Sequence, residues 1–124
     1  MAWIGVDLDG TLAEYGTWQG PDHIGRPIPR MVARVKNWLA QELEVRIFTA
    51  RVGNTGDFVE NSQMFDSSEF AKQQVDVIQN WCEKHIGVRL PVTATKDYGM
   101  IELWDDRCVQ VEPNTGRRMD GKKS

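Results

Sequence analysis

Residues 3–12 read WIGVDLDGTL, and this stretch decides the fold that the sequence predicts. Its apolar start is typical of a short buried strand. Asp7 and Asp9 follow one residue apart, and alternate residues of a strand point to the same side. Both carboxylates are therefore expected to face one crevice at the carboxyl end of the strand, where open α/β sheets bind ligands. Gly10 then lets the backbone turn and approach a ligand closely.

Two carboxylates held this close repel each other. At a separation of about 4 Å and an effective dielectric constant of 20, the repulsion is about 4 kcal/mol. A bound cation is the simplest reason to keep Asp7 and Asp9 together. The alternative is a hydrophobic strand that ends in a polar turn, because Asp-Gly and Asp-x-Asp are common in turns. The rest of the chain has to decide between the two.

Composition limits the class of protein. A chain of 124 residues that is 40% apolar and 27% charged is typical of one soluble globular domain. A net charge of −3 argues against a generally basic nucleic-acid binder, although a local basic patch stays compatible with it. The two cysteines, Cys82 and Cys108, have no metal-binding spacing, so we expect core residues in a reduced, cytoplasmic protein. Asp7 interrupts the first apolar run too early for a signal peptide, and no run is long enough to span a membrane.

Hydrophobic periodicity predicts strands and helices in alternation. Apolar residues recur at helical spacing from Pro29 to about Glu42, and again from Ser67 or Ser68 to a stop near Gly87. The expected strands cover residues 3–6, 45–48, 90–95 and 100–104, with a short fifth at 109–111. This order favours an α/β fold with a mostly parallel sheet. Two long polar loops, 13–29 and 52–68, connect these elements, and the tail 114–124 is expected to be frayed.

Three side chains of the first long loop are candidates for contact with a substrate: Tyr15, Trp18 and His23. We expect Trp18 to pack the loop onto the body of the protein, and His23 to be a surface histidine rather than a catalyst. In the second half of the chain, His85 is expected to be structural.

Polar groups follow four of the expected strands. They are Asp7 with Asp9, then Thr49, then Lys96, and finally Asp105 with Asp106. Because the carboxyl ends of parallel strands meet at one edge of a sheet, we expect a single site there. Several carboxylates suit a hard divalent cation, most simply Mg²⁺. The remaining two side chains, Thr49 and Lys96, suit a phosphate.

The phosphate would be held by hydroxyl, ammonium and guanidinium groups. Thr49 can donate one hydrogen bond, Lys96 supplies a point charge, and Arg51 can donate two parallel bonds. Asp7 is then free to attack the phosphorus atom, which is phosphoryl transfer to a carboxylate. The alternative for Thr49 and Arg51 is a capping threonine beside a solvated arginine.

These residues resemble the haloacid dehalogenase (HAD) superfamily of phosphohydrolases. The stretch 7–11, DLDGT, matches its first motif, and Thr49, Lys96 and the pair Asp105-Asp106 match its second, third and fourth, in the same order. The stretches 49–51 and 105–111 also resemble, more weakly, the phosphatase domain of bacteriophage polynucleotide kinase. The resemblance implies a Rossmannoid three-layer sandwich over residues 1–112, a polar tail over 113–124, and no large cap domain, since neither loop is long enough for one.

The resemblance also implies a role for each motif residue. Asp7 would be the nucleophile that forms an aspartyl-phosphate, and Asp9 would protonate the leaving oxygen and then activate water. Thr49 and Lys96 would hold the phosphoryl oxygens, with Arg51 and Gly10 also at the substrate. Mg²⁺ would be bound by Asp7, by the backbone carbonyl of Asp9, and by Asp105 and Asp106, of which Asp105 is the better candidate for a direct ligand.

The implied activity is that of a Mg²⁺-dependent phosphomonoester hydrolase with a nucleotide, a nucleic-acid end or another phosphomonoester as substrate. An open site suits a phosphate on a large molecule, and it suits a small nucleotide if the 13–29 loop or a second subunit of a homo-oligomer closes over it. Two alternatives stay open. One is a non-catalytic module of the same fold that binds Mg²⁺ or a partner. The other, a phosphoacceptor receiver domain, is disfavoured because no aspartate ends the third strand and Lys96 precedes the last acidic pair.

Overall fold

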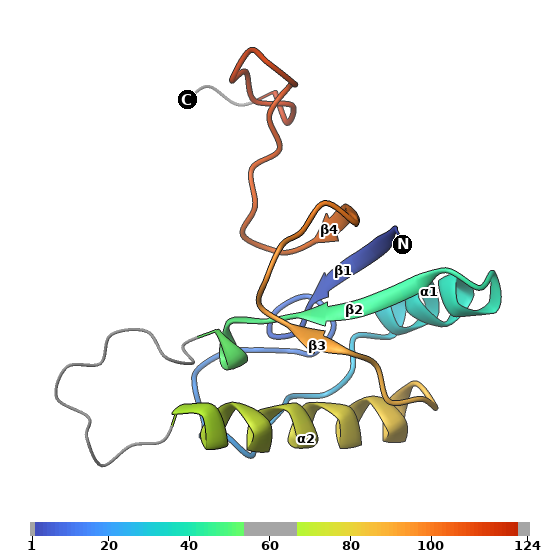
Figure 1. Ribbon diagram of the computed structural model, residues 1–124, viewed down its shortest axis with the longest axis vertical. Helices are drawn as coiled ribbons and strands as arrows, with labels where there is room; N and C mark the ends of the chain where they lie inside the picture. The colour runs from blue at the N-terminus through green and yellow to red at the C-terminus, as the bar shows by residue number, and fades with distance from the viewer. Residues whose placement is uncertain (1, 54–66, 122–124) are drawn as a thin grey trace, which may run out of the picture.

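A parallel sheet with β1 (Trp3–Asp7) in its interior organises the molecule (Figure 1). The computed structural model describes residues 2–53 and 67–121. Within them the strand order is β3-β2-β1-β4, and every neighbouring pair is parallel. The other strands are β2 (Glu44–Phe48), β3 (Val92–Thr93) and β4 (Met100–Trp104). The α/β fold with a parallel sheet, expected from the sequence, is therefore confirmed.

Two helices build the hydrophobic core against one face of this sheet. They are α1 (Pro29–Ala40) and α2 (Ser67–His85). Val6 of β1 is aligned with Ile47 of β2, and both belong to the same buried cluster as residues of both helices, among them Val35 and Ile78. Burial of these side chains supplies the main stabilisation of the fold. It also fixes the carboxyl ends of β1 and β2 in space.

The opposite face of the sheet carries a short irregular link instead of a helix. The two helical connections run from β1 to β2 and from β2 to β3, which is one direction across the sheet. Residues 94–99 connect β3 to β4, beyond β1, and so run in the opposite direction. Because connections between parallel strands are right-handed, this link must lie on the other face of the sheet. There the Trp3 indole donates a hydrogen bond to Asp97 (2.8 Å), and the Arg46 guanidinium lies 4.4 Å from the centre of the Trp3 ring. The expected three-layer sandwich is thus not seen among the described residues, because a six-residue link is too short to form a helical layer.

The helix ends follow local backbone rules. Glu42 has a left-handed φ of 62°, and α1 ends at Ala40, two residues before the expected end. Gly87 has a φ of 105°, and its N–H donates to the Cys82 carbonyl (3.1 Å), so the predicted stop of α2 is confirmed. A short 3₁₀ helix, η1 (Ala50–Val52), follows β2 directly and was not expected.

The C-terminal part of the chain differs most from the expectation. No strand forms at 109–111; Val111 makes only an isolated bridge to Arg118, and β3 is shorter than expected. Residues 110–119 instead form a small hairpin, closed by the bonds Glu112 N–H to Arg117 O (2.7 Å) and Met119 N–H to Gln110 O (2.9 Å). The expected frayed tail is therefore folded as far as Gly121, and the boundary placed at residue 112 falls inside the hairpin.

Of the two cysteines expected in the core, only Cys82 is buried, whereas Cys108 is exposed. Cys108 directly precedes the expected strand at 109–111, which does not form. Among the described residues, no helix is long and apolar enough to cross a membrane. The predicted loop 52–68 lies mostly outside the described residues.

Candidate active site

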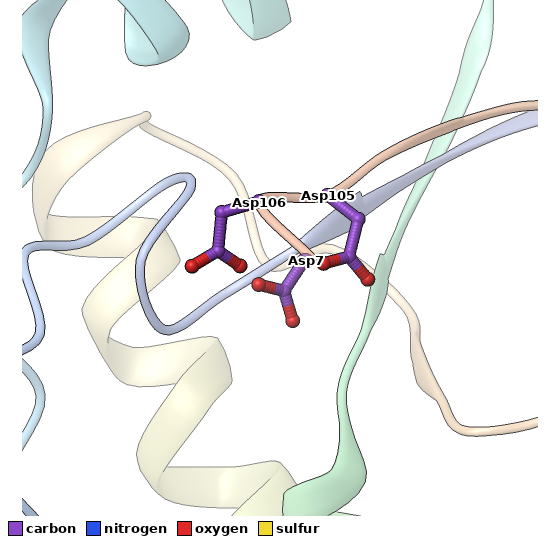
Figure 2. Close-up of side chains that lie close together, drawn as sticks. All are labelled: Asp7, Asp105 and Asp106. Carbon is purple, nitrogen blue, oxygen red and sulfur yellow. The ribbon is translucent and has the colours of Figure 1, made fainter. Parts of the chain in front are cut away.

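Three aspartates meet at the carboxyl ends of β1 and β4. Asp7 is the last residue of β1, and Asp105 and Asp106 directly follow β4, which pairs with β1. One carboxylate oxygen of each lies within 4.8 Å of the others. Figure 2 shows the three side chains gathered at this point. Carboxylate oxygens are the ligands that Mg²⁺ and Ca²⁺ prefer, so these three residues could hold a divalent cation. The sequence predicted this convergence.

The electrostatics of Asp7 reflect this crowding. The pKa of Asp7 is raised from 3.8 to about 7, mainly by partial burial and in addition by the negative charges of Asp105 and Asp106. A hydrogen bond from the Thr11 hydroxyl (3.2 Å) acts in the opposite direction. Without a counter-charge, the site therefore holds a proton on Asp7 near neutral pH.

Gly10 has a steric role at this cluster. Its φ of 94° lies in the left-handed region, and a Cβ added to it would collide with the carboxylate of Asp106. The absence of a side chain at Gly10 therefore lets the Asp106 side chain lie close to the backbone. Gly10 is not among the residues that line the hollow beside the aspartates, and its contact with a substrate stays a prediction.

Thr49 lies beside the aspartates in a hollow of about 540 Å³. It follows β2, and its side chain is buried, with 3% exposed. The Thr49 hydroxyl oxygen accepts a hydrogen bond from the Arg51 backbone N–H (3.1 Å), which caps η1. Because a hydroxyl can accept and donate at once, its proton stays available to a ligand in the hollow. Both expectations for Thr49, a cap and a hydrogen-bond donor, are compatible with this position.

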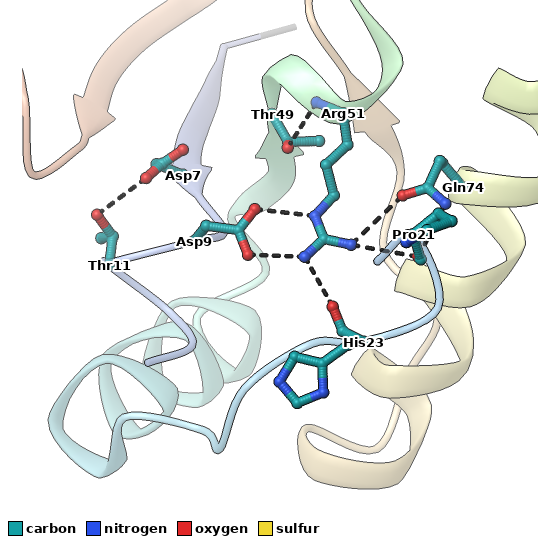
Figure 3. Close-up of polar contacts among 8 residues, drawn as sticks. All are labelled: Asp7, Asp9, Thr11, Pro21, His23, Thr49, Arg51 and Gln74. Atoms are coloured by element: carbon teal, nitrogen blue, oxygen red, sulfur yellow. Dashed lines mark hydrogen bonds and ion pairs between the residues drawn. The ribbon is translucent and has the colours of Figure 1, made fainter. Parts of the chain in front are cut away.

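Arg51 and Asp9 form a bidentate ion pair at the wall of the hollow (Figure 3). The guanidinium Nε and Nη2 atoms lie 2.8 and 2.9 Å from the two carboxylate oxygens of Asp9. Only 6% of the Arg51 side chain and 21% of the Asp9 side chain are exposed, so solvent screens the pair weakly. The alternative of a solvated arginine is therefore wrong.

The remaining donors of Arg51 hold the first long loop in place. Nη2 donates to the His23 carbonyl (2.8 Å), and Nη1 donates to the Pro21 carbonyl and to the Gln74 side chain (both 3.4 Å). The Trp18 ring lies 4.9 Å from the guanidinium. All five N–H donors of Arg51 thus have partners within the protein, and none is left for a phosphate in this arrangement.

The 13–29 loop accordingly forms part of the wall of the hollow. Tyr15 and Trp18 line it, and both side chains are exposed. Trp18 packs the loop onto the body as expected, but through its contact with Arg51 in η1 and not through the hydrophobic core. His23 contributes its carbonyl, while its ring points away from Arg51 (Figure 3), as expected for a surface histidine.

The positively charged side chains around the hollow differ from those that the sequence predicted. Lys96 lies in the exposed link between β3 and β4 and is not among the residues that line the hollow. Arg107, which follows the aspartate pair, does line it, and its backbone N–H donates to Asp105 (2.9 Å). The structure thus brings together Asp7, Thr49 and the two final aspartates with Asp9 and Arg51, and leaves Lys96 outside.

Besides Arg107, sequence reasoning missed a second polar residue of the site. Gln74 of α2 is buried, with 1% exposed, and donates to the Pro21 carbonyl (2.9 Å) in addition to its contact with Arg51. Its burial could have been predicted, because Gln74 precedes Ile78 by four residues and so lies on the apolar stripe of the helix. A polar residue on such a stripe indicates a buried hydrogen-bond partner. Phe48 and Phe70 complete the apolar part of the lining.

Comparisons of the chain with protein-family models, with curated proteins and with solved structures found no match. The chemistry of the site is therefore argued from its own residues.

Proposed function

We propose that this protein is a Mg²⁺-dependent phosphomonoester hydrolase of the haloacid dehalogenase type, with Asp7 as the nucleophile. The observation that carries the proposal is the meeting of Asp7 with Asp105 and Asp106 at the sheet edge, within 4.8 Å between carboxylate oxygens. Thr49 lies in the same hollow. A nucleophile, a set of cation ligands and a phosphate hydrogen-bond donor are thus adjacent.

The donor set fits the proposed metal. It consists of hard carboxylate oxygens, and the raised pKa of Asp7 indicates negative charge that lacks compensation. A bound Mg²⁺ would neutralise the carboxylates and the incoming phosphate and align them for reaction. Asp7, Asp105 and Asp106 would hold it, and the backbone carbonyl of Asp9 is a further candidate ligand.

The reaction then uses groups of this chain. A carboxylate oxygen of Asp7 forms a bond to phosphorus while the bond from phosphorus to the leaving oxygen breaks, and Asp9 gives that oxygen a proton. Asp9 next takes a proton from the water that hydrolyses the aspartyl-phosphate. The Thr49 hydroxyl donates to a phosphoryl oxygen, where charge spreads in the transition state. Phosphate leaves, and Asp7 is regenerated.

Arg51 decides whether Asp9 can take part. Both oxygens of Asp9 accept hydrogen bonds from the guanidinium, so Asp9 has to leave this ion pair and take up a proton from solvent before it can protonate the leaving oxygen. An entering phosphate dianion competes with Asp9 for Arg51, which gives the substrate a direct way to release the acid. The same ion pair favours a second candidate, a module that binds Mg²⁺ without turnover.

The test is phosphate release with and without Mg²⁺ from an aryl phosphate, nucleoside monophosphates and oligonucleotides with terminal phosphates. We expect release that EDTA abolishes and that Asp7→Asn reduces by at least about 10³-fold, as for loss of a nucleophile. Asp76→Asn makes the same chemical change on an exposed face of α2 and should leave the rate unchanged. Bound Mg²⁺ with no release from any substrate would support the non-catalytic module instead.

A second experiment compares the roles of the Lys96 and Arg107 side chains. Lys96→Ala tests the role that the family resemblance assigns, and Arg107→Ala tests the arginine that lines the hollow. If the arrangement seen here is the working one, the Arg107 variant should raise KM more than the Lys96 variant. A larger loss of kcat for Lys96→Ala would instead mean that the link moves to the substrate during turnover.

A further inference from the structure

The segment that follows the aspartate pair carries exposed apolar side chains. Residues 107–121, here called the C-terminal arm, extend away from the sheet beyond β4 (Figure 1). Of nine exposed large apolar residues among those described, five lie between positions 98 and 119: Tyr98, Ile101, Val109, Val111 and Met119. Such a concentration over one part of a chain is typical of a contact surface.

The arm contains a segment with the composition of a strand but no strand partner. Residues 109–111 read VQV, and β-branched residues in alternation favour a strand. Within the described chain, these residues make only the bridge between Val111 and Arg118 and the adjoining hairpin bonds. The other edge of this segment is free to pair.

A free strand edge lies next to the arm. β4 ends the sheet on its side, and its described strand partner is β1 alone. Among the described residues, no backbone hydrogen bond joins the outer edge of residues 101–104 to another segment. The Ile101 side chain on this strand is 60% exposed. Unpaired edges with an exposed apolar residue are templates for a strand from another chain.

Charge favours a second copy of this chain as that partner. Residues 107–124 contain five basic and two acidic residues, which leaves ten basic and sixteen acidic residues in 1–106. The two acidic residues of the arm are already paired, Glu112 with Arg117 and Asp120 with Arg118. Acidic residues surround β4 in the sequence: Asp97 precedes it, Glu102 lies within it, and Asp105 and Asp106 follow it. By sequence, residues 107–124 carry a net charge of +3 and residues 1–106 a net charge of −6, so charge attracts this end of one copy to the acidic surroundings of β4 in a second copy.

We propose that two copies of this chain form a symmetric dimer, in which the 108–111 segment of each copy adds as a strand to the outer edge of the partner's β4. A two-fold axis uses both arms and both edges at once, so neither is left exposed. Val109, Val111 and Ile101 supply the apolar contact, and the backbone groups of the two strands supply the hydrogen bonds. The dimer does not depend on any enzymatic activity.

The test measures molar mass in solution against concentration, by light scattering after gel filtration and by sedimentation equilibrium. Between about 1 and about 100 µM, a range that covers moderate affinities, we expect a species of twice the chain mass of 14.2 kDa. The double variant Val109→Lys/Val111→Lys should raise the dimer Kd at least about tenfold, and Ile101→Lys should do the same from the other side of the interface. Raised salt should also weaken the dimer.

Val88→Lys is the matched control. Val88 lies between α2 and β3 and is 46% exposed, against 48% for Val109 and 50% for Val111. It should leave the dimer intact, and circular dichroism should show all variants folded. A monomer at every concentration would overturn the proposal, and so would a dimer that resists both the arm and the edge variants.

Discussion

Replacing Asp7 by asparagine should stabilise the metal-free protein at neutral and alkaline pH. The pKa of Asp7 is raised from 3.8 to about 7, first by burial and then by the charges of Asp105 and Asp106. At 1.36 kcal/mol per pKa unit, the ionised side chain destabilises the fold by at most about 4 kcal/mol. Because Asp7 is only partly buried, solvent screening reduces this to about 1–2 kcal/mol. Asparagine keeps the shape of the side chain and can still accept the bond from Thr11.

The pH dependence has a definite sign. Between pH 3.8 and about 7 the unfolded state loses the proton of Asp7 while the folded state keeps it, so the stability of the wild type falls as pH rises. The gain from Asp7→Asn should therefore be near zero at pH 4 and complete above pH 7. With Mg²⁺ present the order should reverse, because the cation binds the wild-type carboxylates and stabilises the folded state.

The assay is denaturant unfolding in EDTA at pH 4.5 and pH 8, followed by the same titration in Mg²⁺. Asp76→Asn is the control for the chemical change on an exposed surface. A metal-free Asp7→Asn variant that is no more stable than the wild type at pH 8 would refute the reasoning. An equal gain at both pH values would show that packing, and not charge, is the cause.

Three further predictions concern single side chains. Arg51→Ala should destabilise the fold by about 3 kcal/mol in denaturant unfolding, since it leaves the partly buried Asp9 without its partner, and Arg51→Lys should restore less than half of this; a change below about 1 kcal/mol for Arg51→Ala would contradict a structural ion pair. Gly10→Ala should cost about 1–3 kcal/mol and weaken Mg²⁺ binding measured by calorimetry, because of the positive φ and the collision with Asp106; unchanged metal affinity would place the metal elsewhere. In the native protein a thiol reagent should label Cys108 quickly and Cys82 only after unfolding, since burial raises the pKa of Cys82 to about 11; mass spectrometry that finds equal labelling would contradict the burial of Cys82.

The sequence predicted the elements that are governed by local pattern. The apolar run before Asp7, the helical stripes and the glycine stop at Gly87 each depend on neighbouring residues, and all three have their counterparts in the structure. The convergence of Asp7 with Asp105 and Asp106 followed from one rule, that parallel strands end at the same edge. The meeting of residues from distant parts of the chain could therefore be predicted where those residues directly follow parallel strands.

Predictions failed where tertiary partners decide the outcome. Thr49 could be placed from its strand, but the choice of Asp9 as the partner of Arg51 depends on where the 13–29 loop lies, which no local pattern encodes. The alternation in residues 109–111 favoured a strand, but a strand needs a paired neighbour, and within the described residues this segment makes only the isolated bridge from Val111 to Arg118. Likewise, the link between β3 and β4 has only six residues, which is too short to form a helical layer on the second face of the sheet.

The strand order also has a consequence for how the molecule folds. β1 pairs with β4 across almost the whole length of the chain, since Trp3 is aligned with Met100 and Val6 with Trp104. Contacts of such high sequence separation require the closure of a long loop and tend to form late. When β4 docks, it carries Asp105 and Asp106 against Asp7, so the step that completes the sheet is also the step that gathers three negative charges. A divalent cation would then speed refolding by lowering the barrier of this last docking step, in addition to stabilising the finished fold.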